Sequence, residues 1–410
     1  MKDAAFTTPA TLTLSELAPL LPEGDLRLHG VTARSAAVRN GMLFVATEAD
    51  QTAIAEAIAR GAAAIASETE CTTPCTVPWF RVQDALRLLG HVASRFAAEP
   101  SRRLAVSVVA GGPGRRSLQQ AVATLESNSG VQSIAETLER SRGRGSEQLQ
   151  RRLLSHYRAA RKSVVLECRP EDLRRGRLEG VRIASLVVAG GTSDNTLEHE
   201  TLQALLLRLP EDSLVVMDAD DQEFARLSCL TRALVISVGQ RAEADFSWRV
   251  LRRDRQGQCL EMRSPLGLAR VTLAAIDHGS ALVAALAFAH AVTHGLAPSL
   301  AAEALSERVM GPEALWRLPL PGPFETWQAR GRSRSSLERA LSEVKAFCQG
   351  RVLVIGAPRQ GVGEERGSVI GDALAAARAG DAVLVMSGEE HAADRVLIQD
   401  WFLQGLTGAA

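Results

Sequence analysis

The sequence has no excess of charge of either sign, because Lys and Arg together number 47 and Asp and Glu together also number 47. This balance provides no net field that would favour a nucleic-acid or membrane partner. No apolar run approaches the ~20 residues of a membrane-spanning helix. The nearest, residues 281–297, is short, Ala-rich and contains two histidines, so we expect it to be a buried helix. With no signal peptide in the sequence, we expect a soluble cytoplasmic protein.

A set of two or more closely spaced cysteine pairs, which would indicate a disulfide framework or a zinc site, is also missing. The six cysteines are scattered, and only Cys71 and Cys75 lie close together, separated by a spacer that contains Pro74. No second Cys or His pair lies nearby to complete a zinc site. Scattered thiols are typical of a reducing compartment, so we expect free cysteines.

With 410 residues, of which 46% are apolar, the chain is long enough to bury two or three cores. Short apolar strands alternate with helical patterns along most of it, which favours largely parallel sheets covered by helices. Residues 82–100 form a predicted helix, whereas residues 247–276 alternate as β-hairpins do. We expect strands at residues 41–47, 104–110, 163–168, 184–191, 213–221, 233–239, 351–356 and 381–388.

Two interruptions divide the chain into three predicted domains. The predicted helix of residues 82–100 ends at Pro100, just before an apolar strand, and a Pro/Gly-rich stretch covers residues 318–324. No internal repeat is present. We predict domains at residues 1–100, 101–310 and 311–410.

The segment "SVVAGGPGRRSLQQAVATLE", residues 107–126, predicts a strand, a glycine-rich loop and a helix, which is the layout of a nucleotide-binding phosphate loop. Such loops carry Gly-Lys-Ser/Thr, with the lysine on the phosphates and the hydroxyl on Mg²⁺. Here Arg116 cannot ligate a cation, and Pro113 removes one backbone N–H. The loop either binds a phosphate without metal or is a plain strand-to-helix turn, and we favour the turn. The candidate loop residues are Gly111, Gly112, Gly114, Arg115 and Ser117.

Other chemistry-bearing patterns are weak. The sequence has no Ser/His/Asp order typical of hydrolases and no HExxH motif. His290 and His294 have metal-ligand spacing on a helix, but their Ala-rich surroundings favour core or interface histidines. The acidic residues Asp218, Asp220 and Asp221 follow a strand, where they could bind a cation or simply form a turn. We therefore predict no metal site.

Arginine is dense in residues 139–162. This segment is typical of a solvated helix preceded by an Arg/Gly/Ser loop, although a local basic face is the alternative.

Three blocks follow one another in a characteristic order, namely "VTARSAAVRNGMLFVA" (31–46), "LECRPEDLRRGRLEGVRIASLVVAGGTSDNTLEHET" (166–201) and "GDAVLVMSGEEH" (380–391). This order resembles the Mur ligases, ATP-dependent enzymes that add amino acids to UDP-N-acetylmuramoyl precursors, and is closest to the MurE type. The resemblance implies an α/β protein of three domains. These are an N-terminal domain on the UDP-sugar side, a central phosphate-loop-type domain with a parallel sheet covered on both faces, and a shortened Rossmann-like C-terminal domain.

The same resemblance implies that the catalytic residues have largely been lost. Arg115 stands at the position of the phosphate lysine and Arg116 at that of the magnesium-binding threonine. Remnants of the metal sites are Glu167, Asp194 and His199, and we expect Glu167 to be an ion-paired surface group. The segment for the carbamylated lysine is too short to contain one. The altered metal-site positions are Arg169, Pro170, Glu171, Asn195 and Glu198.

Residues that would contact the substrate and adenine have changed as well. Only Ser35 remains of the DSR signature, and Ala281 and Ala284 replace the asparagines that hold the base in the family. Residues 329–335, "ARGRSRS", stand where the family has DYAHTPD. The lysine of the AGKGHE motif corresponds to Glu389 or Glu390.

These losses favour a non-catalytic Mur-ligase-like protein that acts as a scaffold or regulator in peptidoglycan precursor synthesis and needs no cofactor. One alternative is an ATP-dependent amide ligase with an eroded site, which would use ATP and Mg²⁺; another keeps only a nucleotide or sugar-nucleotide pocket. Expected partners are an active Mur ligase, another acidic cell-wall protein or an anionic sugar nucleotide. The arginines that would face such a partner are Arg140, Arg142, Arg144, Arg151, Arg152, Arg158, Arg161, Arg330, Arg332 and Arg334.

Overall fold

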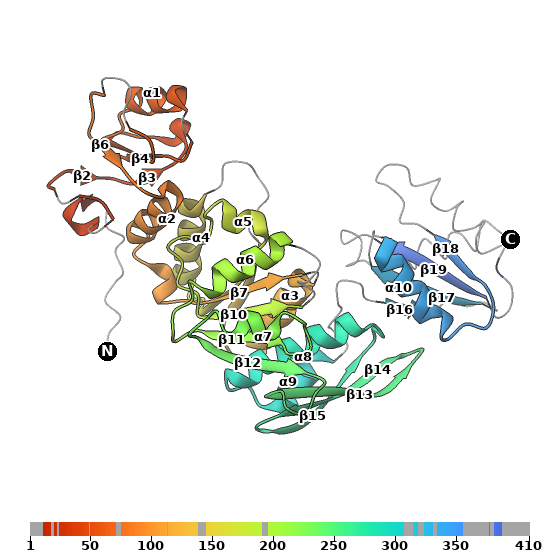
Figure 1. Cartoon of the computed structure of the whole chain (residues 1–410). Helices are drawn as coiled ribbons and strands as arrows, with labels where there is room; N and C mark the ends of the chain where they lie inside the picture. Colours follow the sequence, from red (N-terminus) through yellow and green to blue (C-terminus); the bar gives the residue numbers. More distant parts are fainter. Residues whose placement is uncertain are drawn as a thin grey trace.

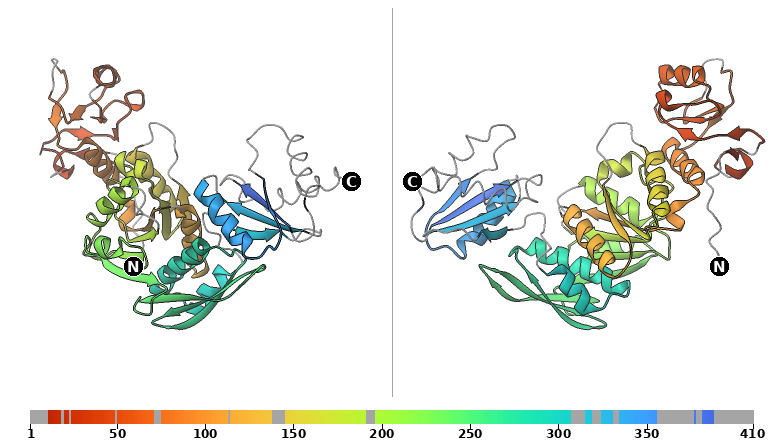
Figure 2. Two further views of the ribbon diagram at one scale, coloured as in Figure 1. Left: turned by 45° about the vertical axis from the view of Figure 1, so that its right-hand side comes forward. Right: turned by 180° about the vertical axis from the view of Figure 1, so that it is seen from behind.

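A computed structural model gives the fold as three bodies built on separate sheets (Figure 1). Figures 1 and 2 show the first body and the C-terminal body on opposite sides of the central one. The structure describes residues 11–17, 20–22, 24–48, 50–70, 75–112, 114–137, 145–190, 196–306, 315–318, 324–330, 334–355, 377 and 381–387.

The first body contains a four-stranded parallel sheet with the order β3-β4-β5-β6. Helices α1 (Gln51–Ala59) and α2 (Ala85–Phe96) begin after Asp50 and Asp84, whose side chains accept backbone N–H bonds of the first turn. The strands are β1 (Leu12–Thr13), β2 (Arg27–Leu28), β3 (Val31–Thr32), β4 (Leu43–Ala46), β5 (Ala64–Ser67) and β6 (Trp79–Arg81). The short 3-10 turns are η1 (Ser15–Leu17), η2 (Ser35–Ala37) and η3 (Pro100–Arg102).

The central body is a nine-stranded sheet with the order β15-β14-β13-β12-β11-β10-β7-β9-β8. Neighbours from β8 to β13 pair in parallel, whereas β13, β14 and β15 form an antiparallel meander. The strands are β7 (Ala105–Gly111), β8 (Ser133–Thr137), β9 (Ser163–Glu167), β10 (Ser185–Ala189), β11 (Leu214–Asp218), β12 (Leu234–Gly239), β13 (Phe246–Asp254), β14 (Gly257–Ser264) and β15 (Gly267–Leu273).

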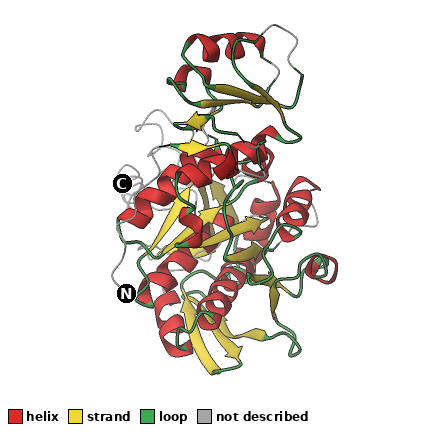
Figure 3. Cartoon of the chain, turned by 90° about the vertical axis from the view of Figure 1, so that its left-hand side faces the viewer, coloured by secondary structure: helices red, strands yellow, loops and turns green. Residues whose placement is uncertain are grey.

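Helices cover both faces of this sheet, as Figure 3 shows. Alternate residues of β7 point to opposite faces, so that Val109 joins the apolar cluster under α3, α8 and α9, and Val108 joins the cluster under α4 and α6. Helix α8 is buried almost along its whole length, as its apolar sequence predicts. The helices are α3 (Arg115–Asn128), α4 (Ser146–Arg158), α5 (Pro170–Arg174), α6 (Thr196–Leu206), α7 (Phe224–Ser228), α8 (His278–Thr293) and α9 (Pro298–Leu305).

The C-terminal body is a four-stranded sheet with the order β16-β17-β19-β18, in which only β16 is antiparallel to its neighbour. Arg255 of the central meander connects to it, because its Nη1 lies 2.6 Å from Glu325 Oε1 and its Nη2 donates to Phe347 O at 2.7 Å. The described elements are β16 (Leu315–Leu318), β17 (Glu325–Arg330), α10 (Arg334–Lys345), β18 (Val352–Ile355) and β19 (Ala382–Ser387).

The predicted α/β class, the parallel central sheet and its antiparallel meander are therefore confirmed. The described cysteines are free, and among the described residues no helix is long and apolar enough to span a membrane. Cys71 lies outside the described residues. The domain boundaries near residues 100 and 310 stay predictions.

Candidate functional site

The glycine-rich loop joins the carboxyl end of β7 to the start of α3, as the sequence predicts. Gly111 has φ +101°, and a Cβ at this position would lie 2.4 Å from the carbonyl oxygen of Ala189 in the neighbouring strand β10. Only glycine fits there. The next residue is held to the same carbonyl, since the N–H of Gly112 donates to Ala189 O at 2.9 Å. This N–H is therefore already used within the protein.

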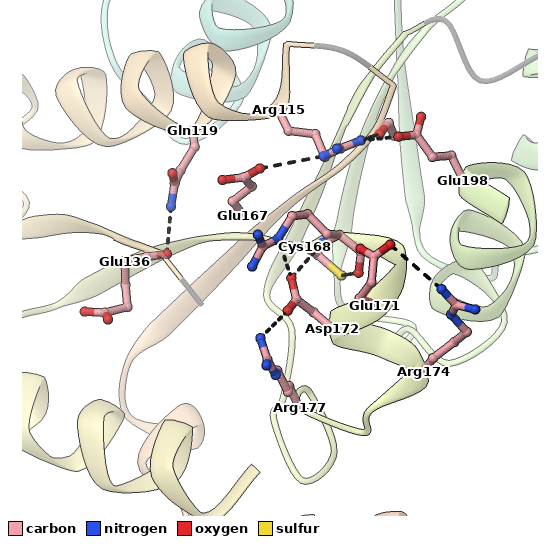
Figure 4. A network of polar contacts seen from close by, with 12 residues as sticks. Arg115, Gln119, Glu136, Glu167, Cys168, Glu171, Asp172, Arg174, Arg177 and Glu198 are labelled. Carbon is pink, nitrogen blue, oxygen red and sulfur yellow. Dashed lines mark hydrogen bonds and ion pairs between the residues drawn. The ribbon is translucent and has the colours of Figure 1, made fainter. Parts of the chain in front are cut away.

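Arg115, the first residue of α3, turns its side chain back toward the loop that precedes it. Its Nη1 donates to the carbonyl oxygens of Gly111 and, at 3.1 Å, Gly112. The same atom lies 2.6 Å from Glu198 Oε1, and the Nε lies 3.8 Å from Glu167 Oε1. Figure 4 shows the guanidinium between these two carboxylates. The loop thus offers carbonyl oxygens to an internal cation.

The two glutamates come from different segments at the carboxyl end of the parallel strands. Glu167 ends β9, and Glu198 lies in the first turn of α6, which follows β10. Their side chains are only 13% and 12% exposed, and that of Arg115 is 17% exposed. A guanidinium between two largely buried carboxylates offsets their mutual repulsion and satisfies part of their hydrogen-bonding capacity. The arrangement is a closed charge cluster at the carboxyl end of the parallel strands.

No protein-family model matches the chain. The 2,6-diaminopimelate-adding UDP-N-acetylmuramoyl-L-alanyl-D-glutamate ligase of Listeria innocua is 23% identical over 381 residues, covering 84% of this chain and 77% of the relative. The corresponding ligase of Alkalilimnicola ehrlichii is 26% identical over 435 residues, covering 94% and 84%.

A solved structure of a UDP-N-acetylmuramoyl-L-alanyl-D-glutamate–2,6-diaminopimelate ligase superposes with a TM-score of 0.74. It covers 92% of this chain and 93% of the other chain at 17% identity, which demonstrates a shared fold. The chain is similar to Mur ligases in sequence and shares their fold. The expected colinear resemblance is therefore confirmed.

The structure brings together only some of the expected remnants of the Mur ligase site. Glu167 is ion-paired as expected, but it is largely buried, and its partner is Arg115 at the start of α3. His199 lies apart from this pair, with its Nε2 2.8 Å from Gln203 Nε2 and 3.8 Å from Glu223 Oε2. Asp194 and Asn195 lie outside the described residues, as do Pro113, Glu389 and Glu390. Glu198, counted in the sequence as an altered position, is a central member of the cluster.

A second ion-pair network beside the loop was not predicted from the sequence. Asp172 is fully buried and accepts hydrogen bonds from Arg177 Nη1 at 2.6 Å and from the N–H and Nε of Arg169 at 3.0 and 3.1 Å. Two arginines thus anchor the short helix α5, shown at the right of Figure 4. Cys168, next to this network, has its pKa raised to about 12, chiefly by burial, so its thiol is not a nucleophile at neutral pH.

Gln119 also holds helix α3 in place, through bonds to the neighbouring strands. The buried amide Nε2 of Gln119 donates to the main-chain carbonyls of Glu136 at 2.8 Å and Val165 at 2.7 Å. These bonds connect α3 to β8 and β9, which lie at the edge of the parallel sheet. The helix that carries Arg115 is therefore fixed relative to the strand that carries Glu167.

The alternative cation sites considered in the sequence are occupied by internal contacts. Asp218 accepts the N–H of Asp220 at 2.9 Å, and Asp220 accepts the N–H of Gln240 at 2.6 Å, so this acidic turn satisfies backbone donors. His290 is completely buried and lies 3.0 Å from Ser185 Oγ, as expected of a core histidine. Within the described residues, no group of three His, Cys, Asp or Glu could hold a metal ion.

Proposed function

We propose that this chain is a non-catalytic member of the Mur ligase family that acts in the cytoplasm as a scaffold or regulator of peptidoglycan precursor synthesis. Its relatives are named as ligases that extend UDP-N-acetylmuramoyl peptides, which supports a role in the same pathway. The observation that carries the proposal is the position of Arg115. Its guanidinium is held by two loop carbonyls and by Glu198, with Glu167 3.8 Å away.

This position conflicts with what phosphoryl transfer requires. The reaction needs backbone N–H donors, a lysine and Mg²⁺ around the γ-phosphate. Here the N–H of Gly112 is bonded to Ala189, and the loop carbonyls accept from Arg115. Moving the arginine away would break charge-assisted bonds of roughly 1.5–3 kcal/mol each. It would also bring phosphate oxygens toward two carboxylates that had lost their cation.

Part of the arginine surface expected to contact an acidic partner is used internally. Arg152 and His156 of α4 both contact Glu136, the His156 Nε2 at 2.9 Å from Glu136 Oε2. Arg151 donates from its Nε to Glu147 O at 3.3 Å. The proposed contact with an acidic partner therefore rests on arginines that lie outside the described residues or whose side chains are not described. These are Arg140, Arg142, Arg144, Arg330, Arg332 and Arg334.

The proposal is tested with purified full-length protein. Isothermal titration calorimetry should show no magnesium-dependent binding of ATP, and ADP release in the presence of precursor peptides and amino acids should match a blank without protein. Magnesium-dependent ATP binding with ADP release above the blank would instead support the alternative, an ATP-dependent amide ligase with an eroded site.

The scaffold role needs a separate readout, because loss of activity alone does not demonstrate a partner. A pull-down from native cytoplasm compares the wild type with a variant in which Arg330, Arg332 and Arg334 are changed to Ser. Specific retention of a Mur ligase or another acidic cell-wall protein, reduced in the variant, is the expected result. An identical set of retained proteins would contradict a role for these arginines.

A further inference from the structure

A cavity of about 620 Å³ lies at the junction of the first and central bodies, away from the phosphate loop. Its walls come from α2, from η3 and from the segments that precede β10 and β11. It therefore lies at the amino ends of the parallel strands, whereas the phosphate loop follows the carboxyl end of β7. Since β7 has seven residues, the two sites are roughly 20 Å apart. The cavity has the size of a small-molecule site.

Arginine dominates the charge of the cavity, which is lined by Arg87, Arg95, Arg102, Arg182 and Arg208. Two of them have carboxylate partners of their own. Arg208 pairs with Glu179, which also lines the cavity, and Arg182 pairs with Asp212. The positive charges of these two arginines are therefore largely balanced by their carboxylate partners.

Of the other three arginines, two share one carboxylate and the third pairs with none among the described residues. Arg95 and Arg102 lie 3.6 and 3.2 Å from the two oxygens of Glu99. Arg87 lies about two helical turns before Arg95 on the exposed side of α2, and its side chain has no partner within the described part of the chain. This wall of the cavity therefore carries excess positive charge, and forked guanidinium groups suit phosphate oxygens.

The remainder of the wall is partly polar and partly apolar. His91 has its pKa lowered, chiefly by burial, although Glu179 opposes the shift, so its imidazole is neutral at pH 7 and can exchange hydrogen bonds. The Oε2 of Glu179 is buried and has no hydrogen-bond partner among the described residues, which leaves an acceptor for a hydroxyl. Leu178, Ile183 and the 67% exposed Leu207 provide apolar contact area.

We propose that this cavity binds a phosphorylated small molecule with a hydroxyl-bearing, partly apolar body, as in a nucleoside phosphate. The phosphates bind Arg87, Arg95 and Arg102, the hydroxyls face Glu179 and His91, and the apolar part packs on the leucines. No metal is needed, because the arginines supply the positive charge. The inference does not depend on the phosphate loop or on the proposed loss of catalysis.

The test uses the full-length protein, with ADP and inorganic pyrophosphate as probes in magnesium-free buffer. Calorimetry should show binding of both, and ADP should bind more tightly because only it offers hydroxyls and a base. Arg87→Gln removes a charge that forms no described ion pair, so it should weaken binding at least about ten-fold without unfolding the protein. The matched control is Arg263→Gln, an exposed arginine of β14, which should bind like the wild type.

A second readout follows His91 by NMR. A bound anion favours the imidazolium form of His91, so the pKa of His91 should rise when the anion binds. The charged groups that already act on this imidazole are Glu179, Arg87, Arg95 and Arg208. Failure of both probes to bind, an unchanged affinity in Arg87→Gln, or equal affinities for ADP and pyrophosphate would overturn the inference. ADP binding that requires Mg²⁺ and is unchanged in Arg87→Gln would contradict the proposed function as well. Binding that depends on Arg87 and does not require Mg²⁺ is compatible with that function.

Discussion

The guanidinium of Arg115 lies 2.6 Å from the Oε1 of Glu198, although 83 positions separate the two residues in the sequence. This pair joins the start of α3 to the start of α6, the helices that follow two neighbouring parallel strands. The arginine that follows the glycine-rich loop therefore bonds to the protein itself and helps to stabilise the fold.

Removing this arginine should destabilise the protein. Arg115→Ala leaves Glu167 and Glu198 largely buried without their shared cation, so the free energy of unfolding should fall by roughly 2–4 kcal/mol. Urea denaturation at pH 7 measures the change. The control is Arg116→Ala, because Arg116 is exposed on the same helix turn and its loss should cost less than about 0.5 kcal/mol. Equal effects of the two substitutions would show that the cluster does not stabilise the fold.

Restoring the usual phosphate-loop residues should not restore catalysis. The double change Arg115→Lys and Arg116→Thr returns a lysine and a magnesium-binding hydroxyl to the loop. The other metal and substrate positions remain altered, so we expect no ligation above a blank, even if weak Mg-ATP binding returns. The measurement is ADP release, paired with calorimetric titration of Mg-ATP. Amide ligation by the double variant would refute the view that the losses extend beyond the loop.

Gly111 should tolerate no side chain. Its φ of +101° costs an L-residue about 1–2 kcal/mol, and the added Cβ would also lie 2.4 Å from Ala189 O. We expect Gly111→Ala to lower the free energy of unfolding by roughly 2–4 kcal/mol. Gly130 is the matched control, because it has φ +82° and no heavy atom within 4 Å of the added Cβ. If Gly111→Ala costs no more than Gly130→Ala, the close approach between β7 and β10 does not constrain this position.

The acidic turn after β11 should make stability depend on pH. The pKa of Asp218 is raised from 3.8 to about 6, first by burial and then by repulsion from Asp220 and Asp221, while the N–H of Asp220 opposes the shift. Because the folded-state pKa exceeds that of the unfolded chain, ionisation of Asp218 costs stability. The cost is absent below the unfolded pKa, grows between these two values and is complete above the higher one.

Asp218→Asn should therefore stabilise the protein at pH 8 by roughly 1–3 kcal/mol and have little effect at pH 4. Thermal unfolding across this pH range measures the difference. The exposed Glu243→Gln controls for the loss of one negative charge. A gain of the same size at both pH values would rule out the burial of an ionised Asp218 as its cause.

Much of the fold could be predicted from the sequence because local patterns determine it. Apolar strands alternate with helical segments, and the glycines of residues 107–126 permit a strand-to-helix turn, so the strand, loop and helix there are confirmed. The buried helix α8 is recognisable because nearly all its residues are small or apolar. The periodicity of these segments requires no knowledge of their partners in space.

The site could be predicted only in part, because its contacts join distant segments. The sequence identifies Arg115 as an altered position and Glu167 as a retained one. It does not indicate that the two side chains face each other, because their rotamers and the placement of the helix decide that contact. Asp172 and Arg177 lie within the block of residues 166–201, but nothing in the sequence indicates that they pair. The arginine-lined cavity is likewise formed by segments that precede three different strands.

Helix α2 contributes to two cores at once. Leu88, Leu89 and Val92 belong to the apolar cluster of the first body, while Gly90 packs against the main chain of Glu179 and Gly180 in the central body. Neither face of α2 can separate from its neighbours without exposing apolar surface or a closely packed backbone. The first and central bodies should therefore melt in a single cooperative transition. The C-terminal body has an apolar cluster that includes only Ile276 from the central body. Beside this contact, the N–H of Leu315 donates to Asp277 Oδ1 at 3.0 Å, and two ion pairs hold the body to the meander. Because this junction is small, the C-terminal body should melt in a separate, salt-sensitive step.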